Sequence, residues 1–506
     1  MEIITMNMTT KHPQPAARAP ASQRVLARCS GFRSSTRLFA STLLLALSGC
    51  ANIQVKPGFE DIQQNVAQHI PQRLQWNQGP QDNEAIETAV KDLLNDTLTL
   101  EEAVQIALLN NRLLQSRYEN LGIAQADLVQ AGLLQNPVFT ASIRSRNAGP
   151  GTNREFSVVE NFLNVFTIPA RKILGTSNFE RAKLEVAKAA LDLATEVKLA
   201  YYWVQADQQA LELFRQAAGA TEAAAELSRR QHQAGTLSRR EQSIHQVFYA
   251  QTLLEVGRTE SQIAGDRERL NRLLGLWGQG TVWILPQRLP EVPESIPAYE
   301  HLESLAIKQR LDLAAAKKEM ESLAYTLGLT RNTRFLSVLG IGISTEHDAD
   351  GGSVTGPTLE LGLPLFDQGQ AKVARSESQL HQAEQRVTAL ATDIRSRVRE
   401  ARIRTLAALD AANHYRRAVL PLHQTIVAES QLFYNGMLLG VYDLLIAKQN
   451  QINAGREYIA AIRDYWLAYT DLEHALGGHF PGTGPAQGNE SEASEDSQTL
   501  KSKNQH

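Results

Sequence analysis

The sequence contains little of what marks several large protein classes. Only two of its 506 residues are cysteines, aromatic residues make up 6% of the chain, and the formal net charge is −3. Because no basic patch or stripe dominates, the charge pattern gives no reason to expect a nucleic acid partner. Beyond the N-terminal region, no apolar run approaches the about 20 residues that a membrane-spanning helix needs. We therefore expect neither nucleic-acid binding nor a protein built from membrane-spanning helices.

Motifs for catalysis or metal binding are also missing. There is no nucleophile elbow, phosphate-binding loop or cysteine cluster. His381, His414 and His423 have spacings that do not place them on one helix face as i, i+4 ligands, and His474 is accompanied only by Glu473. We interpret these histidines as solvated surface residues. The sequence thus predicts no enzyme, no catalytic or metal site and no cofactor.

Residues 1–49 are predicted to be a signal peptide. A basic stretch precedes a short apolar run from Leu38 to Leu47, which leads directly into Leu47-Ser48-Gly49-Cys50. This tetrapeptide resembles the bacterial lipobox, in which cleavage before the cysteine leaves that residue lipidated, for example with palmitate. An ordinary signal peptide is the alternative. We predict Cys50 as the lipidation site.

The cysteine content agrees with export. Removal of the signal peptide takes Cys29 away and leaves Cys50 alone, so the exported chain forms no disulfide of its own. One lipid-modified cysteine tethers a chain to a bilayer surface but does not cross it. Any membrane-spanning element must therefore come from elsewhere in the chain.

A lipid-anchored polar segment at 50–97, with one short helix at Asn83–Leu94, is expected to precede a first structural unit at 98–278. That unit is expected to begin with a helix that starts at a capping box at Thr99 and runs to about Gln135. A hairpin at 137–168 follows, with strands Val138–Ser145 and Glu155–Ile168. A long helix from about Lys172 to Gln233 comes next, and the unit ends with a helix that has a capping box at Ser238 and Glu241 and stops at Leu274. Pro169 is interpreted as the end of the second strand. A helix of about 60 residues is about 90 Å long at ~1.5 Å per residue, which excludes a compact core around it.

The hairpin at 334–366 shows strict alternation of residue type. Phe335, Ser337, Leu339, Ile341 and Ile343 share one face, and the returning strand to Leu365 alternates apolar residues with polar or small ones, after an exposed turn at 346–353. Alternation over about ten residues suits a tilted strand that crosses a bilayer with one face in lipid and the other in water. A soluble hairpin on a globular core is the alternative.

The second half of the chain repeats the first. Residues 306–313 match 107–114, the hairpin at 334–366 matches that at 137–168, the helix turn at Gly436 matches that at Gly235, and Leu476-Gly477 matches Leu274-Gly275. This pattern predicts two repeats, 98–278 and 299–478, joined by a linker at 279–298 that contains a short strand at 281–285. The polar tail at 479–506 is expected to be disordered.

Both long helices carry an apolar residue at every seventh position. In the first helix the series includes Ala190, Val197 and Val204, and in the second, expected to continue to about Tyr434, it includes Val387 and Ile394. A seven-residue period indicates left-handed supercoiling against neighbouring helices. Four strands cannot close a barrel, and open sheet edges are not tolerated in lipid, so two chains with eight strands or three chains with twelve are needed. A closed strand barrel continued by a helical cylinder is a conduit.

These features together resemble the TolC family of outer-membrane efflux proteins over about residues 98–478. The motifs that carry the resemblance are the lipobox, the paired helices at Ala107 and Ala306, the Leu363–Gly369 junction and the turn followed by Val441–Leu445. The resemblance implies a mainly α fold with membrane β structure, in which long coiled-coil helices form a trimeric α-barrel below a 12-strand β-barrel with four strands from each protomer. It implies a lipid-anchored, barrel-spanning protein of the cell outer membrane, with its helices in the periplasm. Its function would be passive exit of substrates in a tripartite efflux pump, with a periplasmic adaptor (membrane fusion) protein and an inner-membrane pump of the resistance-nodulation-division type as partners.

The resemblance also implies a periplasmic gate. Asp443 matches an acidic position just after the second helix turn, where three copies of one carboxylate would favour cations. Tyr434 matches a tether tyrosine of that gate, or lies one residue out of register with it. Ile446 stands where the family prototype has a second Asp. Glu241 holds the equivalent position in the first repeat, where we interpret it as a helix cap.

A lipid-anchored periplasmic coiled-coil adaptor or scaffold protein is the alternative function. It would explain Cys50 and the seven-residue periods. It would not explain two alternating hairpins in equivalent positions of two repeats, and no split lipoyl-like domain flanks a single helical hairpin. The sequence therefore favours the duct.

Overall fold

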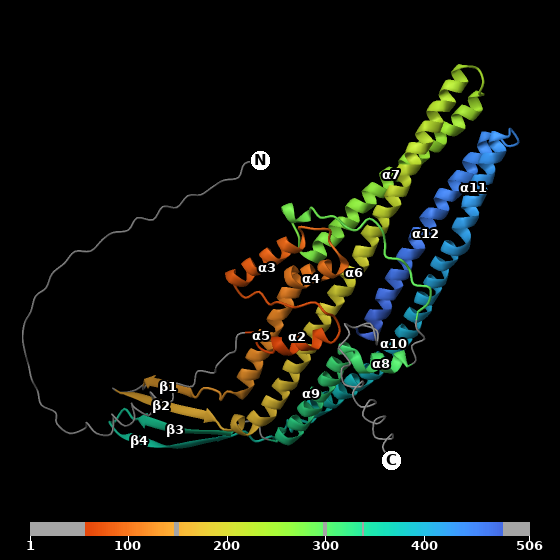
Figure 1. Ribbon diagram of the computed structural model, residues 1–506. Helices are drawn as coiled ribbons and strands as arrows, with labels where there is room; N and C mark the ends of the chain where they lie inside the picture. The colour runs from red at the N-terminus through yellow and green to blue at the C-terminus, as the bar shows by residue number, and fades with distance from the viewer. Residues whose placement is uncertain (1–55, 146–150, 297–300, 336–338, 479–506) are drawn as a thin grey trace, which may run out of the picture. The chain divides into compact units, whose positions relative to one another are not determined.

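The computed structural model describes residues 56–145, 151–296, 301–335 and 339–478 (Figure 1). The signal peptide, Cys50 and the tail at 479–506 lie outside these ranges. The first repeat contains α4 (Leu100–Asn110), α5 (Arg112–Gly132), β1 (Val138–Ser145), β2 (Thr152–Asn161), α6 (Leu163–Gln233) and α7 (Arg239–Leu274). The second repeat contains α8 (Leu302–Gln309), α9 (Leu311–Thr333), β3 (Leu339–His347), β4 (Ser353–Leu361), α10 (Gln370–His414), the π-helical turn η2 (Tyr415–Val419), α11 (Leu420–Asn435) and α12 (Val441–Leu476). The order of elements therefore repeats, as the sequence predicted.

Two helices precede the first repeat. The second of them, α3 (Pro80–Leu93), confirms the short helix predicted in this segment, whereas α2 (Phe59–Ala67) was not predicted. A short 3-10 helix, η1 (Gly278–Thr281), lies between the repeats, and the strand expected at 281–285 is reduced to a single bridge between Thr97 and Ile284. In the described part of the chain, no helix combines the length with the apolarity that a membrane span requires.

The helix predicted from Thr99 to about Gln135 is in fact two helices that meet at Asn111. The capping box at Thr99 forms as expected, with the Glu102 carboxylate accepting from the Thr99 N–H at 2.8 Å. At Asn111, however, ψ is 114° and the chain leaves the helix. The Asn111 side chain accepts from the Leu114 N–H (3.0 Å) and donates to the Leu273 carbonyl at the end of α7 (2.8 Å). One amide thus caps two helix ends, which satisfies backbone groups that would otherwise lack partners.

Arg310 occupies the same place in the second repeat. It breaks the chain between α8 and α9 with ψ 119°, and its guanidinium donates to the carbonyls of His474 (3.4 Å) and Ala475 (3.3 Å) at the end of α12. Arg310 also forms an ion pair with Asp312 at 2.5 Å, and both side chains are largely buried. Asn111 and Arg310 hold matching positions in the predicted repeats. In both repeats the side chain at this position therefore caps the carbonyl end of the last helix.

The hairpins differ from the prediction at their helical ends. β1 has the predicted bounds, but β2 ends at Asn161, and residues 163–168 are the start of α6, so Pro169 lies inside a helix and does not end a strand. In the second hairpin, β4 ends at Leu361 and does not reach Leu365, while Glu346 and His347 belong to β3 and not to the turn. Phe335 follows the end of α9 and does not lie in β3.

The long helices confirm the seven-residue pattern. Ala190, Val197 and Val204 of α6 are buried, as is Ile394 of α10. The second long helix, predicted as continuous to about Tyr434, is interrupted by η2 just before Pro421. Proline lacks the backbone N–H that would extend a regular helix, and a wider π turn accommodates the lost bond.

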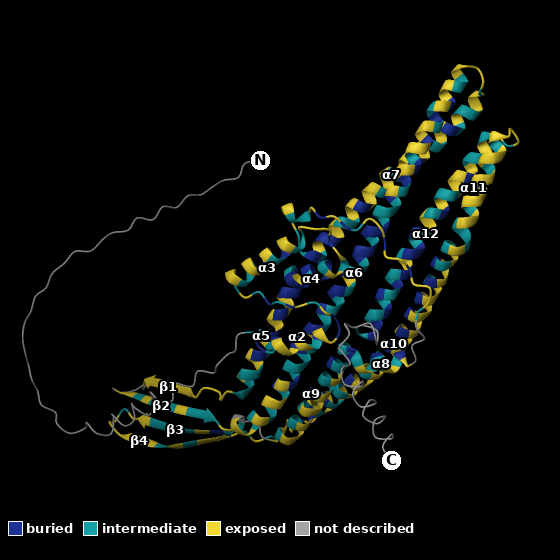
Figure 2. Cartoon of the chain, viewed as in Figure 1, coloured by how far each residue is buried: buried dark blue, intermediate teal, exposed yellow. Residues whose placement is uncertain are grey.

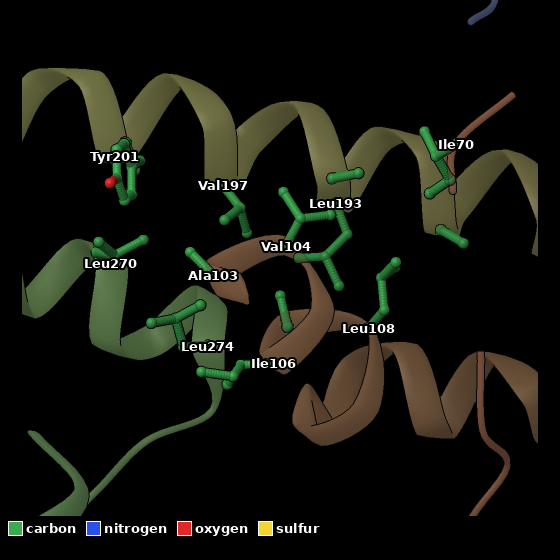
Figure 3. Close-up of a cluster of buried hydrophobic side chains, with 14 of the residues drawn as sticks. Ile70, Ala103, Val104, Ile106, Leu108, Leu193, Val197, Tyr201, Leu270 and Leu274 are labelled. Carbon is green, nitrogen blue, oxygen red and sulfur yellow. The ribbon is translucent and has the colours of Figure 1, made fainter. Parts of the chain in front are cut away.

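The largest core surrounds α4. Its side chains Ala103, Val104, Ile106 and Leu108 pack against residues of α6 and α7, as Figure 3 shows. Aliphatic side chains such as Leu270 and Leu274 have no exposed surface at all. Burial of each such side chain contributes about 1.5–3 kcal/mol. The core therefore holds the middle of α6 and leaves both of its ends free of it.

Asp207 of α6 is a buried carboxyl beside Asp266 of α7. Burial, followed by the hydrogen bond and negative charge of Asp266, raises the pKa of Asp207 to about 6 from its ordinary 3.8, although Arg463 of α12 opposes this shift. The folded chain therefore holds this proton more tightly than the unfolded chain does, and stability falls as pH rises from about 4 to about 6.

We expect Asp207→Asn to remove this loss of stability at higher pH. At pH 7.5 the variant should be more stable than the unsubstituted chain by about 1–3 kcal/mol, and at pH 4 the two should be nearly equal. Thermal unfolding of the detergent-solubilised protein across this range provides the measurement. An unchanged pH dependence in the variant would show that Asp207 does not carry the proton.

Candidate transport path: a two-faced sheet and two helical tips

The four strands form one antiparallel sheet in the order β1-β2-β3-β4. Paired residues on neighbouring antiparallel strands point to the same face of a sheet. Phe139 pairs with Val158, Val158 with Ile343, and Ile343 with Pro357, so these four residues form one row across the sheet. β1 and β4 are the outer strands, and each keeps one unpaired edge within the described sheet.

One face of the sheet is apolar and exposed. Its members come from alternate positions of all four strands: Phe139, Ala141, Ile143, Phe156, Val158, Leu339, Ile341, Ile343, Leu359 and Leu361. Ile343 is 63% exposed and Leu359 69% exposed, and Figure 2 shows most of the strand residues as exposed or intermediate. Two charged residues interrupt this face, Glu160 beside Ile341 and Arg154 beside Ile143. Contiguous apolar surface of this kind marks contact with a membrane or with another protein.

The opposite face is polar and carries an excess of acid. It includes Thr140, Ser142, Arg144, Glu155, Ser157, Ser344, Glu346, Thr358 and Glu360. The Arg144 guanidinium pairs with the Glu155 carboxylate at 3.1 Å, and Glu346 stands directly opposite Glu155 on the next strand. Three carboxylates against one guanidinium give this face a negative field that favours cations.

The turn between α6 and α7 closes as the sequence predicted. Gly235 has φ 75°, a conformation that favours glycine, and the Thr236 N–H donates to the Gln231 carbonyl at 2.9 Å. The Ser238 hydroxyl accepts from the Glu241 N–H (3.2 Å), and the Glu241 carboxylate accepts from the Ser238 N–H (3.1 Å). The hydrogen bond that the Ser238 hydroxyl donates to the Glu241 carboxylate (2.7 Å), followed by that from the Ser238 N–H, lowers the pKa of Glu241. Glu241 is therefore a helix cap, as interpreted.

The turn between α11 and α12 has the same bonds but a different residue at the left-handed position. Gly436 has φ −78°, whereas Met437 has φ 57°. The Leu438 N–H donates to the Phe433 carbonyl at 2.8 Å, as Thr236 does to Gln231 in the first repeat. Met437 and not Gly436 is thus the structural counterpart of Gly235. Met437 is 93% exposed, so this tip presents apolar surface to solvent.

Asp443 lies in the first turn of α12, at the position that Glu241 holds in α7. Its own N–H contacts the Gly440 carbonyl at 3.2 Å, but Gly440 has no side chain with which to form a capping box. The Asp443 carboxylate is exposed, and the positive end of the helix dipole favours its charge. Tyr434 is half-buried and lies near the end of α11, on the other side of the same turn.

A metal site would be a further candidate, in addition to the sheet and the two helical tips. Within residues 56–145, 151–296, 301–335 and 339–478, no group of three or more His, Cys, Asp or Glu side chains gathers as a metal site would require. His474 differs from the solvated histidine that the sequence suggested, because its Nε2 lies 2.8 Å from the Asp192 carboxylate of α6. This pair joins the two repeats. Its partners are 282 positions apart, so spacing alone could not reveal it.

Comparison with known proteins agrees with the family resemblance found in the sequence. No family model matches the chain. The cobalt-zinc-cadmium resistance protein CzcC of Cupriavidus metallidurans is 21% identical over 404 residues, which cover 75% of this chain and 90% of that protein. Among solved structures, CusC, described with transmembrane channel formation, superposes with a TM-score of 0.64 at 16% identity, over 76% of this chain and 93% of that one.

A further solved structure is the outer membrane protein VceC of Vibrio cholerae. It superposes with a TM-score of 0.62 at 18% identity, over 76% of this chain and 97% of that one. About three quarters of this chain thus matches nearly the whole length of each relative. The resemblance predicted from the sequence is confirmed, and the chain has the fold of the TolC-family outer-membrane channels.

Proposed function

We propose that the chain is the outer-membrane channel of a tripartite efflux system, a passive exit duct that does no chemistry. The observation that carries this proposal is the sheet with one exposed apolar face, one polar face and two unpaired edges. Unpaired edges are not tolerated in lipid, so the sheet can enter a membrane only when the edge of β4 pairs with the edge of β1 of another copy. Closure then puts the apolar face in lipid and the acidic face around water.

The duct is a homotrimer with twelve strands. In each copy α6 packs against α5, α7, α9 and α12, and α10 packs against α8, α9 and α12 (Figure 1). The α5 and α7 side of one copy therefore meets the α10 and α11 side of the next. Mass measurement in mild detergent tests the assembly, and a clearly monomeric mass would overturn it.

The partners are a periplasmic adaptor protein and an inner-membrane pump of the resistance-nodulation-division type. The exposed apolar tip at Met437 and Leu438 supports an adaptor contact, since exposed apolar patches mark protein interfaces. Pulldown with cross-linking at Leu438 would identify the adaptor. The polar α6–α7 tip at Thr236 is the matched control position, and cross-links to it alone would count against this contact.

Asp443→Asn is expected to lower cation selectivity. Three exposed carboxylates around one axis attract cations and repel anions, and the amide removes this charge without changing the size of the side chain. The ratio of cation to anion permeability in planar bilayers should fall about two- to ten-fold, as loss of about 0.5–1.4 kcal/mol implies. Glu241→Gln, in the equivalent cap of α7, serves as the control. An unchanged ratio in Asp443→Asn would remove Asp443 from the gate.

Cys50 is proposed to carry the lipid anchor. Its replacement distinguishes the duct function from the alternative function as a coiled-coil adaptor. Cys50→Ser should leave a barrel in the outer membrane after carbonate extraction, because the sheet holds it there. An adaptor held only by lipid should be released into solution. Release of the variant would therefore favour the adaptor function.

Divalent metal cations are the substrate class that we propose to test first. The name of CzcC links that relative to resistance against cobalt, zinc and cadmium, and the acidic face of the sheet suits cations. Deletion of the gene should sensitise cells to these metals and leave sensitivity to anionic drugs unchanged. The opposite pattern would exclude metals as substrates.

A further inference from the structure

A groove lies between the first turns of α6 and the last turns of α9. Its volume is about 510 Å³, which is within the range of ligand pockets. Most of its lining is apolar, with Leu163, Phe166 and Ala170 from α6, Tyr325 and Leu329 from α9, and Leu339 from β3. Phe166 is 73% exposed, so the groove opens to the surface.

The groove continues the apolar face of the sheet. Leu339, which lines the groove, is also the last member of that face, next to Leu361 on β4. Further exposed apolar side chains follow the strand ends in the sequence or precede the strands, at Phe162, Phe166, Phe335 and Leu363. If the sheet crosses the membrane, as proposed above, its apolar band reaches down onto the helix ends. The groove then opens into the inner leaflet.

Basic residues are neighbours of the lining residues in the sequence, but none of them lines the groove. Arg171 follows Ala170, and Arg331 and Arg334 flank the lining residues Asn332 and Thr333. The Arg334 guanidinium lies 4.3 Å from the centre of the Phe335 ring, and Arg331 pairs with Glu377 at 2.5 Å. An apolar groove that continues a lipid-facing surface matches an acyl chain.

Gly328 keeps the groove open on the α9 side. It lies inside a helix, where glycine costs about 1 kcal/mol relative to alanine. A Cβ at this position would meet no atom within 4 Å, so glycine is not needed for packing inside the chain. The missing side chain leaves space that an outside molecule could fill.

We propose that this groove binds one acyl chain of a phospholipid from the inner leaflet of the membrane. The inference rests on the proposed function, because it requires the sheet to lie in the bilayer. The bound lipid fills the gap between the two repeats where they meet the sheet, and so seals the helix–strand junction against water.

The test is photo-cross-linking of the purified, full-length protein in phosphatidylethanolamine vesicles that contain phosphatidylglycerol with a diazirine acyl chain. Cross-links should map to residues 163–170 of α6 and 324–333 of α9 in addition to the apolar face of the sheet. Gly328→Leu should reduce the groove cross-links about ten-fold. Gly219→Leu is the matched control, since Gly219 is also a helical glycine with no atom within 4 Å of an added Cβ. Ala324→Phe fills the same groove from a second position. It keeps the test valid if Gly328→Leu does not fold.

The outcomes distinguish failure of the lipid site from failure of the proposed function. Cross-links on the sheet but not in the groove, or groove cross-links that survive both filling variants, would overturn the lipid site and leave the duct intact. Absence of cross-links on the sheet as well would overturn the proposed function itself. Groove cross-links that appear only when Cys50→Ser removes the lipid of the chain would show that the native occupant is that lipid and not a free phospholipid.

Discussion

Replacement of Ile343 by Arg is expected to abolish assembly in the outer membrane. Ile343 lies in the middle of the row Phe139, Val158, Ile343 and Pro357, and its side chain is 63% exposed on the apolar face. An arginine that faces lipid near the bilayer midplane costs about 2–4 kcal/mol, and a trimer would carry this cost three times. The fraction of protein recovered as trimer from outer membranes should fall at least about ten-fold.

The control is Thr140→Arg on the opposite face. Thr140 is exposed and lies one row away from Ile343, on the polar face, where arginine would stand in water. This variant should assemble normally. In a soluble monomer both positions are solvated and both substitutions would be tolerated equally. Equal behaviour of the two variants would therefore exclude the membrane orientation of the sheet.

Arg310→Ala is expected to destabilise the second repeat by about 3–5 kcal/mol, because removal of one partner leaves the other charge buried and unpaired. The Arg310 side chain is 8% exposed and that of Asp312 is 16% exposed. The substitution also leaves the carbonyls of His474 and Ala475 without the guanidinium. The midpoint of thermal unfolding, followed by circular dichroism in detergent, should fall clearly.

A double variant tests the cause. Arg310→Ala with Asp312→Ala removes both charges and should recover part of the lost stability. Asn111→Ala in the first repeat breaks only neutral hydrogen bonds, to Leu114 and Leu273, and should cost about 1–2 kcal/mol. If Arg310→Ala costs no more than Asn111→Ala, the buried ion pair does not stabilise the repeat.

The features that the sequence predicted well depend on near neighbours. Both capping boxes, at Thr99 and at Ser238, involve residues three positions apart, and both form. The bounds of β1 were also predicted, because Asn136-Pro137 before it and a glycine-rich turn after it are local signals. The seven-residue period predicted which side of α6 is buried. Local chemistry and periodicity suffice for each of these.

The features that the sequence predicted wrongly depend on distant partners. Asn111 and Arg310 break their helices to meet carbonyls that are 162 and 165 positions away. The helix turn predicted at Gly436 forms there, but its left-handed residue is Met437 and not the glycine. Pro169 was interpreted as a strand end, yet it lies within α6. At Asn111 and Arg310 the local helix signal gave way to hydrogen bonds with distant helix ends.

The sequence by itself determined that the chain is a duplicated unit of strands and long helices with one polar and one apolar strand face, because residue type and spacing encode which side of an element meets water. Only the tertiary structure decided that all four strands form one sheet with two free edges. It also decided that the apolar surface continues past the strands into the groove between α6 and α9. The physical reason is that edges and grooves form between segments far apart in the chain, whose relative positions depend on long-range packing and not on local pattern.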